Sequence, residues 1–325
     1  MTEKRYVLCR PQGGLNDTLC QIEICRAYAA RYGRILIVDG RQSGVLGEFG
    51  NYFRMAGAGH IFDMTDKAVP DIDSLDCYPP EVQGRVSTLR SKRNPAPGWR
   101  CAVDLDTEVA LRFPLDRDHP QTLLLHQKEG GGTNSFDLIN RLTLVPWLAQ
   151  QARDKIAQLP VGYSALHVRN TDYRTDIGMV LSAIRDRVAG QDLLVCSDDP
   201  AVLPALRSGL PDTRIHQITT LVYDGGRPQH TTAGVADGIV RHHVATGSIV
   251  DLCAMAAAST LYVSVLRSKE GNESADFTGM NRLSGYSKLA VHLCQNKKLL
   301  RRLLGGFRFG FNPWPLAGSV RIIQP

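Results

Sequence analysis

An apolar, strand-like run over residues 163–168 leads directly into the polar sequence HVRNTDY at 167–173. His167, Arg169 and Asp172 thereby meet at the carboxyl end of a strand, the place where α/β sheets bind ligands. The planar guanidinium of Arg169 suits a phosphate, because it binds two oxygens at once and keeps its charge at any working pH. The alternative is an ion pair of Arg169 with Asp172 that only holds the loop. The residues alone leave these two interpretations equal.

A glycine turn follows the first strand-like run, within the sequence RPQGGLNDTL. Gly13 and Gly14 permit a ligand to approach the backbone closely, and the pattern predicts a helix over about 18–32, capped by Asn16 or Asp17. The N–H groups at such a helix start favour an anion. The alternative is a plain strand-to-helix turn, which this segment alone favours. Its spacing fits neither GxGxxG nor the Walker A pattern.

Two further segments bring carboxylates to candidate positions. LLVCSDDP, residues 193–200, places Ser197 and Asp198 after another strand, where they could hold a metal ion or a sugar hydroxyl. A cap on the following helix is the interpretation that we favour, so we predict no metal site. Asp251 ends an S-x-x-D capping pattern that predicts a helix over 248–258. In a base pocket, the same carboxylate could instead accept the two adjacent N–H groups of guanine.

Strand-like and helix-like stretches alternate over residues 6–39 and again over 163–265. This alternation indicates parallel sheets covered by helices. We therefore expect an α/β fold with two Rossmann-like domains, one over 1–155 and one over 156–295, followed by a basic, aromatic tail over 296–325.

Composition excludes several classes of protein. The eight cysteines are scattered with no CxxC pair, which is typical of reduced thiols in a cytoplasmic protein. No signal sequence opens the chain, and no apolar run approaches the roughly 20 residues that span a bilayer. From Phe277 onward there are eight lysines and arginines and no acidic residue. Since the rest of the chain is slightly acidic, we expect no nucleic-acid partner.

The tail over 297–315, KKLLRRLLGGFRFGFNPWP, predicts a helix with basic residues on one side and leucines on the other, followed by aromatic residues. Such a segment suits binding to an anionic membrane surface. The alternative is that the leucines pack on the domain and the basic side is only solvated. The sequence leaves both interpretations open.

Five motifs, taken in order, resemble the GDP-fucose-dependent fucosyltransferase superfamily, which contains the bacterial nodulation α1,6-fucosyltransferases, the α1,2-fucosyltransferases and the protein O-fucosyltransferases. The H-x-R-x-x-D pattern is the most specific element, and the resemblance extends from residue 8 to about 292. It implies a GT-B arrangement, in which two Rossmann-like domains face a central cleft, and an inverting transfer that needs no metal. The motifs are GGLND at 13–17, VDGRQS at 38–43, HVRNTDY at 167–173, VCSDDPAV at 195–202 and DLCAMAAASTLYVS at 251–264.

The resemblance also implies roles for individual residues. Arg169 would hold the β-phosphate of the donor, and His167 would lie beside its guanine and ribose. The backbone of the glycine turn would face the diphosphate, Asp251 would read guanine, and Ser264 falls near the diphosphate contacts. The full set of expected donor-binding residues is Gly13, Gly14, Leu15, Asn16, His167, Arg169, Ser197, Asp198, Asp251 and Ser264.

For catalysis, the resemblance makes Arg169 the group that stabilises the leaving diphosphate. Asp172, Asp176 or a departing phosphate oxygen would take the proton of the acceptor. The sequence departs from the superfamily pattern in two places: Asn170 stands where a second cation is often found, and the stretch over 266–287 is longer and more charged.

The function expected is an inverting glycosyltransferase that moves L-fucose from GDP-fucose to a hydroxyl of a glycan or of a lipid-linked oligosaccharide. The GDP-sugar is a substrate, and no cofactor is expected. The alternatives are a glycosyltransferase with another nucleotide-hexose donor, and a non-catalytic relative that binds a nucleotide or glycan. The expected location is the cytoplasm, with peripheral contact at the inner face of the cytoplasmic membrane if the tail binds lipid.

Overall fold

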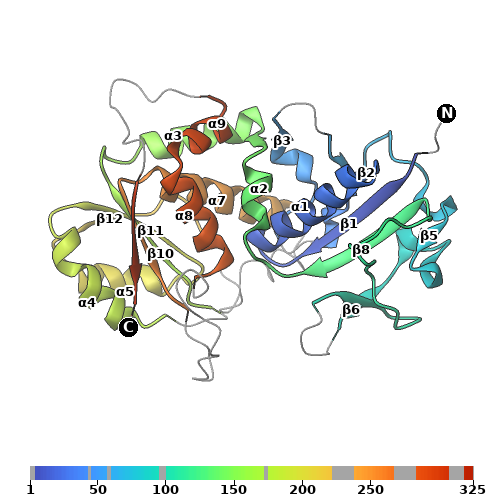
Figure 1. Cartoon of the computed structure of the whole chain (residues 1–325). Helices are drawn as coiled ribbons and strands as arrows, with labels where there is room; N and C mark the ends of the chain where they lie inside the picture. The colour runs from blue at the N-terminus through green and yellow to red at the C-terminus, as the bar shows by residue number, and fades with distance from the viewer. Residues whose placement is uncertain are drawn as a thin grey trace. The chain divides into compact units, whose positions relative to one another are not determined.

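The computed structural model describes residues 4–42, 45–56, 60–94, 100–171, 175–221, 238–266, 283–306 and 318–324. The chain divides into two compact units, Met1–Leu142 and Thr143–Pro325. Each unit is built on a five-stranded sheet in which all neighbouring strands are parallel (Figure 1). The α/β class expected from the alternation of strands and helices is confirmed.

The sheet of the first unit has the strand order β4-β2-β1-β8-β5. Helix α1 covers β1, β2 and β8 and packs against the short helix α2 (Figure 1). A glycine turn thus feeds a helix that lies on the sheet, as the sequence indicates. The elements are β1 (Tyr6–Gln12), α1 (Leu15–Arg31), β2 (Ile35–Val38), β4 (Phe62–Asp63), β5 (Cys77–Tyr78), β8 (Leu123–Glu129) and α2 (Asn134–Ile139).

The opposite face of this sheet is covered by short elements. A core of aliphatic residues from β1, β2 and β8 packs there against side chains of the segment that links β5 to β8, such as Val82, Val86 and Leu111. That segment contains 3-10 turns and an antiparallel pair of strands, β6 and β7. The remaining short elements of this unit are η1 (Gly40–Gln42), η2 (Phe49–Asn51), β3 (Phe53–Met55), η3 (Ile72–Ser74), η4 (Pro80–Val82), η5 (Val86–Thr88), β6 (Ser91–Arg93) and β7 (Ala102–Asp104); β9 (Leu142–Leu144) lies at the boundary.

A buried ion pair joins the ends of β1 and β2. Nε of Arg10 donates to Asp39 at 2.9 Å, and both side chains are 1% exposed. Nε of Arg41 donates to the same carboxylate at 2.7 Å. Burial alone would raise the pKa of Asp39, but hydrogen bonds and charge from Arg41 and Arg10 bring it below its usual value. Two residues of the VDGRQS motif, Asp39 and Arg41, therefore form ion pairs within the first unit.

The sheet of the second unit has the order β12-β11-β10-β13-β14. Helices α4 and α5 pack on one face of this sheet, and α7 and α8 pack on the other (Figure 1). The elements are α3 (Pro146–Ala157), β10 (Ser164–Val168), α4 (Ile177–Val188), β11 (Asp192–Ser197), α5 (Val202–Gly209), β12 (Arg214–His216), α7 (Gly238–Ala257), β13 (Thr260–Ser264), α8 (Gly285–Gln295), α9 (Lys297–Leu303) and β14 (Ser319–Ile323).

The boundary between the units lies at 142/143, and not near residue 155 as the sequence led us to expect. The reason is α3, which packs against α7 of the second unit. The apolar side of α3, with buried Leu148 and Ala152, instead completes the second unit.

The end of the chain is part of the second unit and is not a separate tail. Helix α9 buries Leu299, Leu300 and Leu303, and β14 adds a parallel strand to β13. Residues 307–317, which include the aromatic part of the expected membrane segment, lie outside the described residues. The leucines are thus docked, whereas binding of this segment to a membrane stays a prediction.

The expected division of α9 into a basic side and a leucine side is wrong for Lys297, which is buried. Its side chain is 1% exposed, and its ammonium group donates to the carbonyl oxygens of Ala256 and, at 2.7 Å, Ala258. These carbonyls lie at the C-terminus of α7, where helix carbonyls lack partners within the helix and favour a cation. Burial lowers the pKa of Lys297. This lysine therefore caps α7, and Lys298 and Arg302 are exposed instead.

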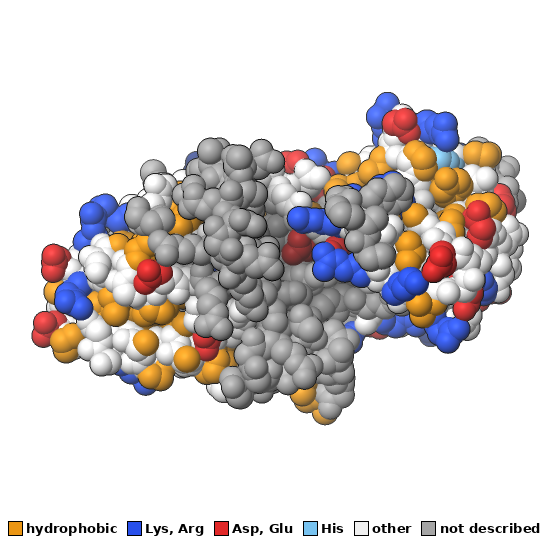
Figure 2. Space-filling view, turned by 90° about the horizontal axis from the view of Figure 1, so that it is seen from below, with side chains coloured by type: hydrophobic (Ala, Val, Ile, Leu, Met, Phe, Trp, Pro, Cys, Tyr) orange, Lys and Arg blue, Asp and Glu red, His pale blue; other side chains and the backbone are white. Residues whose placement is uncertain are grey.

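Among the described helices, none combines the length and apolar character needed to cross a membrane. On the face shown in Figure 2, basic, acidic and hydrophobic side chains are interspersed over the described surface. Among the described basic residues near the end of the chain, Lys297 is buried, whereas Lys298, Arg302 and Arg321 are exposed.

Replacing Lys297 by Met should lower the free energy of unfolding by about 1–3 kcal/mol, because two buried carbonyl groups lose their donor. Lys298→Met, one residue later at an exposed position, should change it by less than about 0.5 kcal/mol. Urea denaturation of both variants measures the difference. Equal losses of stability would contradict the capping role.

Candidate functional site

The candidate site of the second unit begins where β10 and β11 end. Asp198 accepts hydrogen bonds from the backbone N–H of Asn170 at 2.7 Å and from the hydroxyl of Thr171 at 2.5 Å. A guanidinium nitrogen of Arg169 lies 3.9 Å from the same carboxylate. Asp198 therefore holds in place the loop that carries the HVRNTDY motif.

The next residues after β11 strengthen this connection. The side-chain amide of Asn170 donates to Asp199 at 2.7 Å, and Asp199 also accepts from the N–H of Ala201 at 2.8 Å. The hydroxyl of Ser197 accepts from the N–H of Asp199 at 3.1 Å. The predicted cap by an aspartate on the following helix is wrong, because α5 has Ala201 as its N-cap and no side-chain hydrogen bond closes its start. Donor binding by Ser197 and Asp198 stays a prediction.

Arg169 lies just beyond β10 with its side chain 20% exposed. Its carbonyl oxygen accepts from the hydroxyl of Thr175 at 2.7 Å, and that hydroxyl lies 3.3 Å from the hydroxyl of Ser264 at the end of β13. Arg169 and Ser264 therefore meet at one edge of the sheet. Thr175 was missed by sequence analysis, since no motif marks it. Asp172, the other expected partner of Arg169, lies outside the described residues.

His167 is buried on the face of the sheet that α7 and α8 cover. Its Nδ1 lies 2.8 Å from the hydroxyl of Ser287, and its ring lies 5.2 Å from that of Tyr286. Burial, with a smaller contribution from the charge of Arg169, lowers the pKa of His167 to about 3. The imidazole is therefore neutral at physiological pH. It can exchange hydrogen bonds with a hydroxyl or a base, but it does not serve as a cationic phosphate ligand.

Asp251 approaches the same face from α7. It accepts a hydrogen bond from the hydroxyl of Thr219 at 2.7 Å and another from the thiol of Cys196. Cys196 and His167 are register partners on β11 and β10, so Asp251 lies near His167. Burial raises the pKa of Asp251 to about 7. Thr219 belongs to no motif, and Cys196 lies within VCSDDPAV but was not singled out as a site residue.

The capping pattern proposed for Asp251 is wrong. Helix α7 runs without interruption over Gly238–Ala257, so Ser248 is an interior residue and caps nothing. The carbonyl of Ser248 instead accepts from the hydroxyl of Tyr286 at 2.6 Å. A small polar residue three positions before an acid imitates a helix start in the sequence. The helix continues through this position, and α7 packs against α3 and α8.

The glycine turn belongs to the first unit. Gly13 has a φ of 100°, a region that favours glycine. Helix α1 starts at Leu15 with Gly14 as its N-cap, so the predicted capping by Asn16 or Asp17 is wrong. Because Gly14 has no side chain, no side-chain hydrogen bond closes this helix start.

Asn16 has a different task within the first unit. It is 2% exposed, accepts from the hydroxyl of Ser135 at 2.7 Å and donates to the carbonyl of Gly132 at 3.3 Å. These bonds hold the loop before α2 against the glycine turn. A Cβ on Gly131 would lie 2.8 Å from the side-chain amide of Asn16, so a larger residue there would have to displace that side chain. Contact of the turn with a diphosphate stays a prediction.

Asp176 is the N-cap of α4 and accepts from the N–H of Met179 at 3.0 Å. This local bond gives the carboxylate a structural role, and its part in proton transfer stays a prediction. Within the described part of the chain, no three His, Cys, Asp or Glu side chains gather as a metal site would require.

The elevated pKa of Asp251 has a consequence for stability. The pKa of about 7 in the folded protein lies well above the ordinary pKa of an aspartate. Unfolding therefore releases a proton between these two pH values, and stability falls as the pH rises through this window. Relative to the wild-type protein, Asp251→Asn should therefore gain stability from pH 4 to pH 7, by at most about 1.4 kcal/mol per pH unit.

Urea denaturation at several pH values tests this expectation, with Asp186→Asn on the exposed side of α4 as the matched control. The control should show no such trend. If the difference between Asp251→Asn and the wild type stayed constant across the window, the carboxyl would not be protonated in the folded protein near neutral pH.

No family model matches the chain, and a search of characterised protein sequences gave no match. Solved structures do resemble it. Fucosyltransferase NodZ from Bradyrhizobium is 14% identical with a TM-score of 0.54, over 89% of this chain and 92% of that chain. NodZ alpha-1,6-fucosyltransferase soaked with GDP-fucose is 16% identical with a TM-score of 0.52, over the same shares.

POFUT1 in complex with GDP-fucose is 10% identical with a TM-score of 0.53, over 98% of both chains. Agreement over nearly whole chains at such low identity is a likeness of fold. It confirms the GT-B class and the pair of Rossmann-like units that the sequence motifs implied. The chain therefore has the fold of the GDP-fucose-dependent fucosyltransferases.

Proposed function

We propose that the chain is an inverting glycosyltransferase that transfers L-fucose from GDP-fucose to a hydroxyl of a glycan. One observation carries the proposal: Arg169, Ser264, His167 and Asp251 gather around the carboxyl ends of β10, β11 and β13. They do so in a fold shared with structures that contain GDP-fucose. Ligands of parallel α/β sheets bind at this edge.

Arg169 would stabilise the negative charge that develops on the leaving diphosphate. Its backbone is held by Thr175, and the loop behind it by Asp198. A hydrogen-bond donor such as the Arg169 guanidinium is effective when the protein already holds it in position, because no reorganisation is needed as the negative charge develops. Ser264, 2% exposed next to Thr175, would add a hydroxyl on the same side.

Asp251 and His167 would form the base pocket. A carboxylate accepts the two adjacent N–H groups of guanine, and no other common base presents this pair. The neutral imidazole of His167, held by Ser287, would bond the ribose or the base. Because Asp251 must give up its proton to accept both bonds, GDP binding should release a proton at neutral pH and below.

The first unit would hold the acceptor, which we take to be a glycan or a lipid-linked oligosaccharide. The proton of the attacking hydroxyl would pass to Asp172, Asp176 or a phosphate oxygen of the departing diphosphate. Since Asp176 is engaged as a helix cap, the phosphate oxygen and Asp172 are the better candidates.

A donor screen separates this proposal from its rivals. The purified protein is incubated with GDP-fucose, GDP-mannose and UDP-sugars, and release of the nucleoside diphosphate is measured. Turnover of GDP-fucose alone supports the proposal. Turnover of another sugar nucleotide would show that the donor is not GDP-fucose. GDP binding without turnover would indicate a non-catalytic relative.

Arg169→Lys should lower the rate of transfer by on the order of 10²–10³ while the melting temperature stays close to that of the wild type. Lysine keeps the charge but loses the planar fork that binds two phosphate oxygens. Arg187→Lys, exposed on α4, is the matched control and should retain full activity. Full activity in Arg169→Lys would refute the phosphate role.

Asp251→Asn should weaken GDP binding about tenfold or more, because an amide cannot accept both guanine N–H groups. Calorimetric titrations in two buffers of different ionisation enthalpy should also show the proton release of the wild type disappear in the variant. Unchanged affinity in the variant would place guanine elsewhere.

A further inference from the structure

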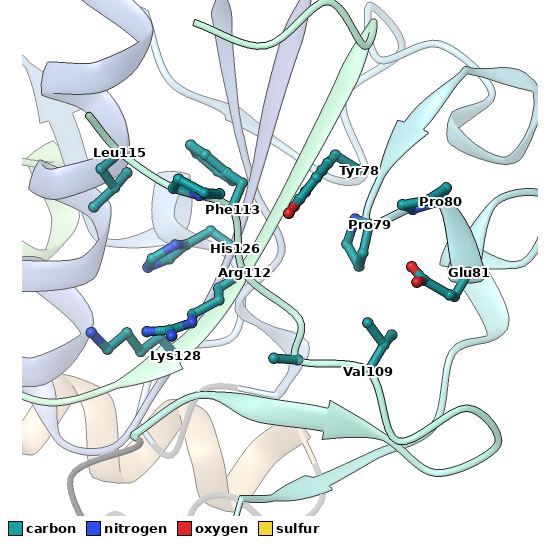
Figure 3. Close-up of a pocket in the computed structure, with 12 residues that line it drawn as sticks. Tyr78, Pro79, Pro80, Glu81, Val109, Arg112, Phe113, Leu115, His126 and Lys128 are labelled. Carbon is teal, nitrogen blue, oxygen red and sulfur yellow. The ribbon is translucent and has the colours of Figure 1, made fainter. Parts of the chain in front are cut away.

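The first unit contains a cavity of about 680 Å³ that the donor site does not use. The rings of Tyr78 and Phe113, with neighbouring prolines, supply apolar walls. Besides the hydroxyl of Tyr78, the polar groups among the described lining residues are Arg112, His126 and Lys128, with Glu81 on the far side (Figure 3). A few polar groups on an apolar lining are typical of a small-molecule site.

The hydrogen bonds around His126 fix its tautomer. The side-chain amide of Gln21 donates its N–H to the carbonyl of Gly130 at 2.7 Å, so its oxygen faces His126. Nε2 of His126 lies 2.9 Å from that oxygen and must therefore carry the hydrogen. Nδ1 is left as an acceptor. Among the described residues it has no hydrogen-bond partner, although His126 is only 2% exposed.

The surroundings of His126 keep it neutral and make one side of the cavity positive. In Figure 3 the side chains of Arg112, His126 and Lys128 extend in the same direction. Burial, followed by the charges of Lys128 and Arg112, lowers the pKa of His126 to about 4. At neutral pH the lining of the cavity thus carries two cations next to the neutral imidazole of His126, whose Nδ1 is a buried acceptor.

A buried acceptor without a partner costs free energy unless a ligand supplies a donor. A hydroxyl group next to an anionic group satisfies the whole set: the hydroxyl donates to His126, and the anion lies against Lys128 and Arg112. The rings of Tyr78 and Phe113 suit the apolar faces of a sugar ring. An inorganic anion such as phosphate would contact only the two cations and would leave the aromatic walls of the cavity uncovered.

We propose that this cavity binds an anionic saccharide, a sugar that carries a carboxylate or phosphate group next to free hydroxyls. If the proposed glycosyl transfer holds, the cavity narrows the class of acceptor to acidic glycans. Binding of an anionic saccharide to the cavity involves the first unit only and does not depend on that transfer.

Binding is measured by calorimetry on the full chain with no nucleotide present. The probes share one ring: methyl glucoside, methyl glucuronide and methyl glucoside 6-phosphate, with inorganic phosphate as a fourth. At least one acidic glycoside should bind about tenfold or more tightly than the neutral one, and which one does so identifies the anion. Equal affinities for all three glycosides, or inorganic phosphate binding as tightly as the sugar phosphate, would overturn the proposal.

Two variants that change the charge of the cavity in opposite directions show whether a loss of binding comes from charge or from a loss of folding. Lys128→Gln should weaken binding of the acidic glycoside about tenfold. Glu81→Gln, which removes the one carboxylate among the residues that line the cavity, should tighten it. Arg117→Gln, exposed nearby, is the control and should change nothing. If Lys128→Gln and Glu81→Gln shift the affinity in the same direction, charge does not govern this cavity.

A second assay separates this inference from the proposed function. With GDP-fucose present, the acidic glycoside should accelerate GDP release and the neutral one should not. Binding without donor turnover would refute the glycosyltransferase proposal and leave the cavity as an anionic-sugar site. Donor turnover with no binding of the acidic glycosides would refute the proposed anionic-sugar site and leave the proposed glycosyltransferase function intact.

Discussion

The candidate site depends on one carboxylate, Asp198, that joins the loops leaving two neighbouring parallel strands. It accepts the N–H of Asn170 and the hydroxyl of Thr171, and both bonds act on the segment that begins with Arg169. Loops are usually the mobile part of an α/β unit. A guanidinium that must meet a diphosphate in one geometry needs a backbone that does not move. Asp199 and Thr175 add bonds to the same segment, so the position of Arg169 is determined by several contacts.

Burial then sets the charge of the groups beside it. His167 lies beneath α7 and α8, Asp251 projects from α7 toward the same face of the sheet, and the pKa values of both are shifted toward their neutral forms. Near neutral pH His167 is uncharged and Asp251 is partly protonated, in contrast to the permanent charge of Arg169 at the edge. This division fits a ligand with an uncharged base at one end and a charged diphosphate at the other. The same burial makes Asp251 responsive to pH in the physiological range.

The sequence predicted the parts of the fold that depend on local pattern. Alternating strands and helices gave the parallel sheets, and the polar residues that end β10 and β11 do lie at one edge. It failed where distant contacts decide. Lys297 looked like part of a solvated basic side, but the end of α7 needed a cap. The S-x-x-D pattern resembled a helix start because nothing local shows that α7 continues. Gln21 and His126, 105 residues apart, could not be paired from the sequence.

We propose that the carboxyl edge of the second sheet binds GDP through Arg169 and Asp251. A crystal structure of the protein with GDP tests this proposal most directly. We expect diphosphate oxygens within hydrogen-bond distance of the Arg169 guanidinium, and the guanine N1 and N2 groups on the carboxylate of Asp251. A diphosphate held without Arg169, or a guanine far from α7, would contradict it.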